Sequence, residues 1–156
     1  MSTEHGFSGV LVARGTVQRG DQRGRTIGFP TVNLLLDGDE LLDGVWAGWL
    51  ALADERHPVA ISVGRRPTFY GNDGQRVLEA HVLDFDREIY GELVTVWLCA
   101  PIRPQRQFDS VDQLTAQLVR DVDQCRAWAH ANSDIWHSWP VDVMPQGVAL
   151  PMPLIA

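Results

Sequence analysis

The segment of residues 24–33, GRTIGFPTVN, carries residue types that handle phosphate and metal ions. Its glycines allow backbone N–H groups to approach an oxyanion closely. Thr31 and Asn33 lie two residues apart, which places them on one face of a strand, and their side-chain oxygens suit Mg²⁺. A structural turn that leads into a strand is an equally good interpretation of this segment alone.

Glu79 is a second candidate, because it stands inside the alternating apolar pattern of residues 77–85. A carboxylate in such a strand costs free energy unless it is solvated, paired or used. Three interpretations follow: an exposed face, an ion pair with an arginine, and a general base for catalysis. His81 falls on the same face by the period of two, and a hydrogen-bonded structural histidine is the more common role there.

Arginines form the third group of candidates. Arg65 and Arg66 precede the loop sequence PTFYG and could bind phosphate or belong to a solvated loop. Arg103 lies between a predicted strand and a predicted helix. Its guanidinium could bind an oxyanion or stack on an aromatic ring, and an ion pair with a helix carboxylate is as good an interpretation.

Six short apolar segments have to position these residues. Turn-forming residues separate the segments, which are residues 8–17, 29–36, 45–52, 59–63, 77–85 and 93–99. A helix follows, capped by Ser110 or Asp109. Its apolar stripe recurs at spacings of three and four, through Val111, Leu114, Leu118, Val122, Cys125 and Trp128 or Ala129. Six strands and one helix predict a mainly β fold, a small barrel with the helix packed on its sheet.

Composition excludes several classes of protein. The chain has 156 residues and a net charge of −7, which argues against general affinity for nucleic acid or anionic membranes. All 13 basic residues are arginine, so a phosphate-binding loop that needs lysine is excluded. The sequence has no signal peptide or transmembrane pattern, and its two cysteines are expected to be buried thiols. We therefore expect a cytoplasmic protein.

The run RGDQRGRTIGFPTVNL of residues 19–34 resembles the signature of riboflavin kinases, and most closely the kinase module of bacterial bifunctional riboflavin kinase/FMN adenylyltransferases. Further matches follow in the family's order over residues 9–129. They are GVWAG at 44–48, PTF at 67–69, LEAHVLDF at 78–85, YGE at 90–92, IR at 102–103 and FDS at 108–110. Several ordered motifs with the correct spacing are far more specific than any one of them.

The resemblance implies a six-stranded Greek-key β-barrel with a C-terminal α-helix over residues 1–132. Residues 133–156 would be a proline-rich extension that lies on the body of the protein or on a partner. Few residues precede the first predicted strand, so an adenylyltransferase domain and FAD synthesis are not expected. The protein would be a monomer or a small homo-oligomer.

The implied reaction transfers the γ-phosphoryl group of ATP to the ribityl 5′-hydroxyl of riboflavin and yields FMN and ADP. The resemblance assigns Glu79 as the catalytic base, and Thr31 and Asn33 to Mg²⁺ and the nucleotide. The remaining assignments place Gly20, Arg25 and Gly28 in a loop over the phosphates and Val82, Asp84 and Arg103 at the flavin.

The sequence departs from the family pattern at four positions, where Val32, Trp46, Arg66 and Gln105 replace the usual residues. None of these departures affects Thr31, Asn33 or Glu79, so an active kinase is expected. The alternatives are a non-catalytic flavin-binding module, such as a carrier or sensor, and a barrel that binds oligonucleotides. The negative charge and the scarcity of basic clusters weigh against the second.

Overall fold

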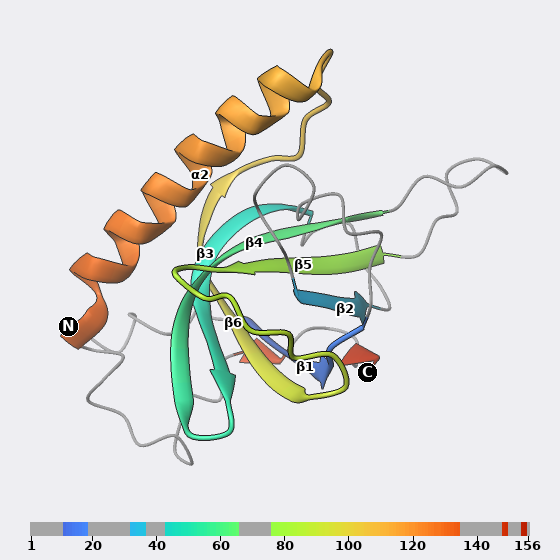
Figure 1. The fold of residues 1–156 in the computed structure, drawn as a ribbon, viewed down its shortest axis with the longest axis vertical. Helices are drawn as coiled ribbons and strands as arrows, with labels where there is room; N and C mark the ends of the chain where they lie inside the picture. The colour runs from blue at the N-terminus through green and yellow to red at the C-terminus, as the bar shows by residue number, and fades with distance from the viewer. Residues whose placement is uncertain are drawn as a thin grey trace, which may run out of the picture.

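A computed structural model describes residues 11–18, 32–36, 43–65, 76–134, 148–149 and 154–155 of the chain. These residues form a strongly curled, mainly antiparallel sheet with one long helix lying across its outer face (Figure 1). The predicted mainly β fold with a C-terminal helix is confirmed. Within the described residues, no helix is long and apolar enough to cross a membrane.

All six predicted strands are present. They are β1 (Leu11–Thr16), β2 (Val32–Leu36), β3 (Gly44–Leu52), β4 (Glu55–Arg65), β5 (Arg76–Val82) and β6 (Leu93–Arg103). Their spatial order is β1-β6-β3-β4-β5-β2, with antiparallel pairing throughout. Because β6 returns to pair with β3 after the β3-β4-β5 meander, these four strands form a Greek key.

Two strands are longer than their apolar patterns predict. A tight connection through Ala53 and Asp54 pairs Leu52 with Glu55, so β4 begins four residues before the predicted strand. Strand β6 continues to Arg103 through two irregularities in its register with β3. Strand pairing therefore extends β4 into the largely polar residues 55–58 and β6 into residues 100–103, which include Pro101.

The C-terminal extension adds two short strands that were not predicted. Strand β7 (Val148–Ala149) runs parallel to β1, and β8 (Leu154–Ile155) runs antiparallel to β2. Strand β8 also contacts β1. The extension thus pairs with both edges of the six-stranded sheet and brings the sheet to eight strands.

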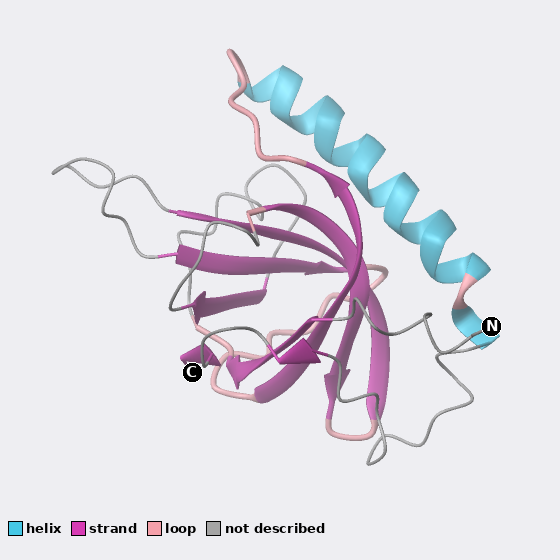
Figure 2. Ribbon diagram, turned by 180° about the vertical axis from the view of Figure 1, so that it is seen from behind, coloured by secondary structure: helices cyan, strands magenta, loops and turns pink. Residues whose placement is uncertain are grey.

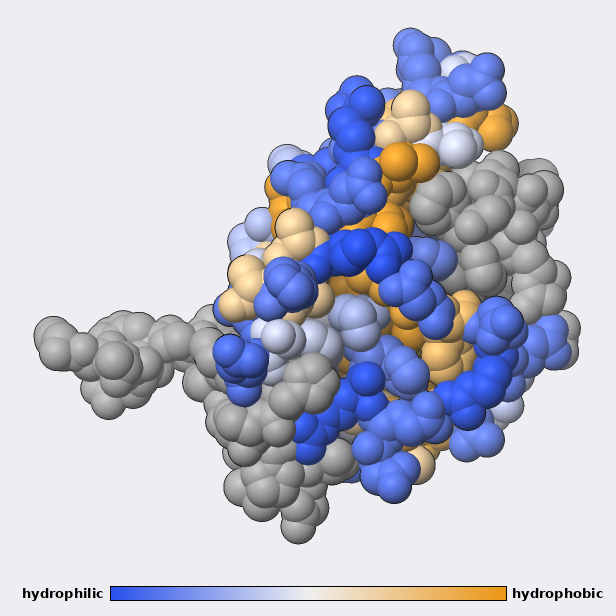
Figure 3. Space-filling model, turned by 60° about the vertical axis from the view of Figure 1, so that its left-hand side comes forward, coloured by the Kyte–Doolittle hydropathy of each residue, from blue (hydrophilic) through white to orange (hydrophobic). Residues whose placement is uncertain are grey.

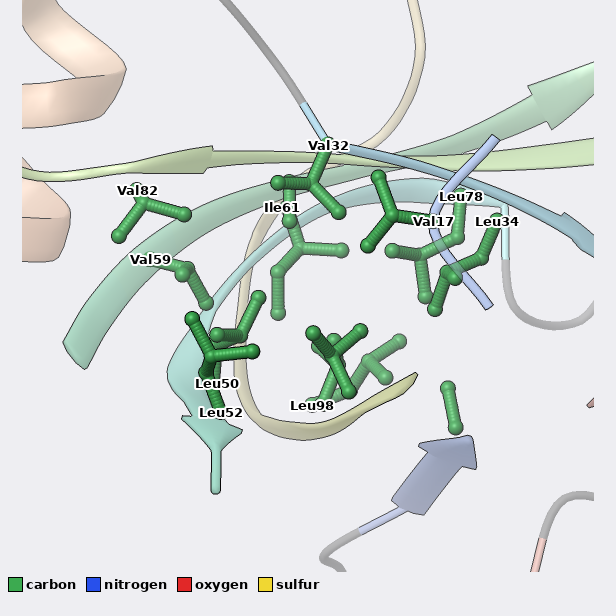
Figure 4. Packing of buried hydrophobic residues seen from close by; sticks show 14 of the residues in the cluster. Val17, Val32, Leu34, Leu50, Leu52, Val59, Ile61, Leu78, Val82 and Leu98 are labelled. Atoms are coloured by element: carbon green, nitrogen blue, oxygen red, sulfur yellow. The ribbon is translucent and has the colours of Figure 1, made fainter. Parts of the chain in front are cut away.

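The main core fills the concave side of the curled sheet. Aliphatic side chains from all six long strands meet there, and most of them are fully buried (Figure 4). On β5, Leu78, Ala80 and Val82 belong to this core, as the period of two predicts. Glu79 and His81 consequently lie on the opposite, outer face of the sheet.

Helix α2 (Val111–Ala131) covers part of the outer face (Figure 2). The side chain of Ser110 caps it by accepting a 3.1 Å hydrogen bond from the backbone N–H of Gln113. Val122, Cys125 and Ala129 are buried against the sheet, but Val111 is 61% exposed. The predicted apolar stripe therefore packs on the sheet only through its later part.

Figure 3 shows an interrupted band of hydrophobic surface between the hydrophilic outer side of α2 and the rest of the molecule. Beneath the helix, the sheet presents small side chains at Ala47, Ala60 and Ala100. Small side chains at these positions leave room for the helix to approach the strands closely.

Candidate active site

One row of paired positions crosses five strands on the outer face of the sheet. In spatial order the row consists of Arg103 on β6, Val45 on β3, Ser62 on β4, Glu79 on β5 and Asn33 on β2. We call these five positions the outer row. Residues at directly paired positions share one face of a sheet, so three residues predicted from sequence, at 33, 79 and 103, lie along one line.

The centre of the candidate site is the pair formed by positions 79 and 33. Glu79 is half-buried and lies directly opposite Asn33 on the neighbouring strand. Position 31 is one residue before β2 and is outside the described residues, as are three other predicted phosphate-loop positions, Gly20, Arg25 and Gly28. The nucleotide side of the site stays a prediction.

The side chains available at the site can be compared with the ligands that a metal ion needs. Within the described residues, no group of three or more His, Cys, Asp or Glu side chains could hold a metal. A hard cation such as Mg²⁺ needs few protein ligands, because water and phosphate oxygens complete its octahedral coordination. A threonine hydroxyl and an asparagine carbonyl fit that requirement, so the predicted pair Thr31 and Asn33 is chemically suited to the ion.

Arg103, predicted to contact the flavin, makes an ion pair with a helix carboxylate. Its Nε and Nη2 atoms donate to the two carboxylate oxygens of Asp121 at 2.9 and 2.8 Å. Asp121 is only 2% exposed and also accepts a 2.9 Å hydrogen bond from Gln117 Nε2. The guanidinium lies 5.8 Å from the centre of the Phe108 ring. The ion pair that the sequence left open is therefore present, and a flavin contact by Arg103 stays a prediction.

The two other predicted flavin residues lie away from the outer row. Val82 ends β5 with its side chain buried in the main core, so a ligand could reach it only through backbone atoms. Asp84 is exposed, has a φ of +56°, and pairs with Arg126 on α2. The structure thus does not bring these two residues together with Glu79, and their contacts with flavin stay predictions.

Sequence reasoning missed three residues around the row, namely Ser62, Gln117 and Asp121, and it noted Gln105 only as a departure from the family pattern. Gln105 Nε2 donates to Ser62 Oγ at 2.7 Å, which ties the segment before α2 to the middle of the row. Asp121 could have been found, because it lies between Leu118 and Cys125 at the helical spacing of the buried face. Ser62 carries no sequence signal, and its contact with Gln105 could not be predicted, since the two residues are distant in the chain.

Comparison with known proteins gives the family. The riboflavin kinase (Flavokinase) family model matches residues 10–129. The bifunctional riboflavin kinase/FMN adenylyltransferase of Listeria monocytogenes is 41% identical over 117 residues, which are 74% of this chain and 37% of that protein. The RNA-binding riboflavin kinase RibR of Bacillus subtilis is 35% identical over 113 residues, which are 72% of this chain and 49% of that protein. The chain therefore spans half or less of the length of these two relatives.

A solved structure agrees with the sequence matches. The crystal structure of riboflavin kinase from Trypanosoma brucei superimposes with a TM-score of 0.56 at 27% identity, covering 76% of this chain and 79% of that one. The family match over residues 10–129 includes the six strands from β1 to β6, five of which carry the outer row, and most of α2. This chain belongs to the riboflavin kinase family.

Proposed function

We propose that the protein is a riboflavin kinase. It transfers the γ-phosphoryl group of ATP to the ribityl 5′-hydroxyl of riboflavin and releases FMN and ADP. The observation that carries the proposal is the pairing of Glu79 with position 33 on adjacent strands, in a chain that matches the family over residues 10–129. In this proposal the general base and the metal ligands come from neighbouring strands of one rigid sheet.

Glu79 acts as the general base in this proposal. Its carboxylate orients the 5′-hydroxyl of riboflavin and accepts the proton as the new P–O bond forms. A rigid strand suits this role, because phosphoryl transfer depends mainly on in-line positioning of the attacking oxygen. The half-buried setting of Glu79 keeps the carboxylate accessible to a substrate hydroxyl.

The phosphate side of the reaction falls to residues at and before β2. Thr31 and Asn33 would hold Mg²⁺, which supplies charge neutralisation at the phosphate oxygens when it is bound. Gly20 and Gly28 would provide backbone N–H groups, and Arg25 a mobile cation. Without lysine in the chain, arginine is the only strongly basic side chain for this task.

The residues proposed to contact the flavin are Arg103, Val82 and Asp84. Three strand spacings separate Glu79 from Arg103, a distance of about 14 Å. Val82 and Asp84 would contribute through the strand end and the turn after β5.

The test is incubation of the full chain with riboflavin, ATP and Mg²⁺, followed by chromatographic separation of FMN. Glu79→Gln should abolish FMN formation while riboflavin binding stays within about twofold, because the amide keeps the shape of the side chain but cannot accept the proton. The exposed Glu92→Gln is the matched control and should keep wild-type turnover. Thr31→Ala should lose activity chiefly through a higher KM for Mg²⁺–ATP.

Two outcomes would contradict the proposal in different ways. Riboflavin binding by the wild-type chain without any FMN would favour the alternative, a flavin-binding module without catalysis. Near wild-type turnover of the Glu79→Gln variant would leave the kinase activity standing but remove Glu79 as the base.

A further inference from the structure

Two arginines beside the first half of α2 converge on one side-chain oxygen. Arg106 Nη1 donates to Gln117 Oε1 at 3.3 Å, and Arg120 Nη2 donates to the same oxygen at 3.2 Å. Both arginines are exposed, whereas Gln117 is buried. We call Arg106 and Arg120 the arginine pair. Because they share one acceptor atom, their two guanidinium groups are close neighbours at the surface.

Neighbouring side chains hold the arginine pair in place. The guanidinium of Arg106 lies 5.0 Å from the centre of the Phe108 ring, which stacks beneath it. Gln117 is fixed from the other side, because its Nε2 atom donates to Asp121 Oδ1 at 2.9 Å. A carboxylate can only accept, so the amide nitrogen has to face Asp121 and the amide oxygen has to face the arginine pair. The arrangement is therefore set before any ligand binds.

No carboxylate neutralises the arginine pair. Both oxygens of Asp121 are engaged by Arg103. Within the part of the chain that the structure describes, no ion pair includes either member of the arginine pair, although α2 also carries Asp112 and Asp123. Two like charges close together repel each other, and the amide oxygen between them is neutral. The place therefore has an excess of positive charge, in a chain whose net charge is −7.

We propose that the arginine pair binds a small multivalent oxyanion of the phosphate class. Each guanidinium has several N–H donors, and Gln117 occupies one donor of each. The remaining donors of both groups can meet one tetrahedral anion, whose oxygens accept charge-assisted hydrogen bonds at about 2.7–2.9 Å. The anion would also relieve the repulsion between the two cations.

This site is distinct from the proposed nucleotide site. Gln117 connects through Asp121 to Arg103, which lies at the opposite end of the outer row from Asn33. The proposed phosphate loop precedes β2, whereas the arginine pair belongs to α2 and to the segment before it. The inference therefore does not depend on the proposed kinase reaction.

The convergence of the two guanidinium groups favours a small ion over a long polyanion. A nucleic acid or an extended acidic peptide needs a row of cations, and the overall negative charge of the chain repels it. The next arginine along α2, Arg126, is already paired with Asp84. Two donors that meet at one point instead present themselves to one compact group.

The experiment titrates the full chain with sodium pyrophosphate in a calorimeter, at constant ionic strength and without Mg²⁺. Arg106→Met and Arg120→Met should each weaken binding by about tenfold or more, because each removes charge-assisted hydrogen bonds. Arg120→Lys keeps the charge but loses the planar fork, so its affinity should fall between those of wild type and Arg120→Met. ADP, titrated in the same way, distinguishes the phosphates of a nucleotide from a free phosphate.

Two control variants accompany these titrations. Arg126→Met removes an exposed arginine from the same helix and should leave the affinity within about twofold of wild type, since a single distant charge acts only weakly in salt. Thr31→Ala alters the proposed nucleotide site, where pyrophosphate could also bind, and should leave binding at the arginine pair unchanged. Thermal melts verify that each variant is folded.

The outcomes separate this inference from the proposed function. It is overturned if wild type binds no pyrophosphate at millimolar concentration, or if Arg126→Met weakens binding as much as Arg106→Met does, because general charge attraction predicts that result. Binding that is lost in Thr31→Ala and kept in both arginine variants places the anion at the nucleotide site and also overturns it. A wild-type chain that forms no FMN would refute the kinase proposal alone, since anion binding needs no catalytic step.

Discussion

Replacing Arg103 by methionine should cost far more folding free energy than a surface arginine does. Asp121 is 2% exposed, and Arg103 supplies two of its three hydrogen bonds, the third coming from Gln117. The Arg103→Met variant leaves a buried carboxylate with one neutral donor. Breaking a buried pair from one side typically costs about 3–5 kcal/mol. In a chain of this size, that loss corresponds to a fall in melting temperature of roughly 6–20 °C.

A second pair on the same helix is the control. Arg126 pairs with Asp84, but the two side chains are 49% and 75% exposed. Exposed pairs contribute about 0–1 kcal/mol, so Arg126→Met should shift the melting temperature by only a few degrees. The comparison holds the residue type and the substitution constant and contrasts a buried pair with an exposed one, with Arg103 on β6 and Arg126 on α2.

The assay is urea unfolding, monitored by tryptophan fluorescence. The double variant Arg103→Met/Asp121→Leu is measured in the same way. Replacing both partners by apolar groups removes the buried charge, so this variant should recover most of the lost stability. A destabilisation below about 1 kcal/mol in Arg103→Met would refute the argument from burial. The KM for riboflavin in this double variant then tests the flavin contact separately. If Arg103 contacts the flavin, that KM should be higher than in wild type even though stability has returned.

Three further outcomes follow from local geometry. Gly48→Ala should unfold or strongly destabilise the protein in a thermal melt, because the added Cβ would lie 1.8 Å from a carbonyl oxygen of β6. The control is Gly91→Ala, whose Cβ meets nothing within 4 Å. This variant should lower the free energy of unfolding by about 1 kcal/mol, because of its φ of +80° alone. Burial raises the pKa of the Cys99 and Cys125 thiols from 9.0 to about 12. Both thiols should therefore resist iodoacetamide at pH 8 in the native protein and react in urea, and rapid labelling of the native protein would contradict this. Because the unfolded chain ionises these thiols first, the free energy of unfolding should fall as pH rises above 9. Ser110→Ala should cost about 1 kcal/mol in urea unfolding by removing the helix cap, and an unchanged midpoint would show that the cap is dispensable.

The strands and the helix were predictable because each carries a local period. Leu78, Ala80 and Val82 alternate as a half-buried strand must, and Ser110 begins the helix with a capping residue. The longer β4 was not predictable, because its first residues are polar and are ordered by pairing with β3. Local pattern predicts the burial of one face, whereas pairing depends on residues far apart in the chain.

The candidate site was predictable residue by residue but not as an arrangement. Glu79 and Asn33 were candidates from their residue types and strand positions, and the resemblance assigned their roles, but their direct pairing could not be read from a separation of 46 positions. Asp121 lies at helical spacing from Leu118 and Cys125, so its place on the buried face could be inferred from the sequence, whereas its partner could not. Its burial follows from a charge on Arg103, 18 residues away.

The two short strands of the C-terminal extension bear on association between molecules. Without β7 and β8, strands β1 and β2 are the two edges of the sheet, with unpaired backbone donors and acceptors. Such edges are templates for pairing with another chain. The extension lies beyond the family match at residue 129 and pairs in cis with Leu11 and Val12 on one edge and with Leu35 and Leu36 on the other. Because the extension covers part of both edges, a chain cut at residue 132 should form soluble oligomers or precipitate at concentrations where the full chain does not.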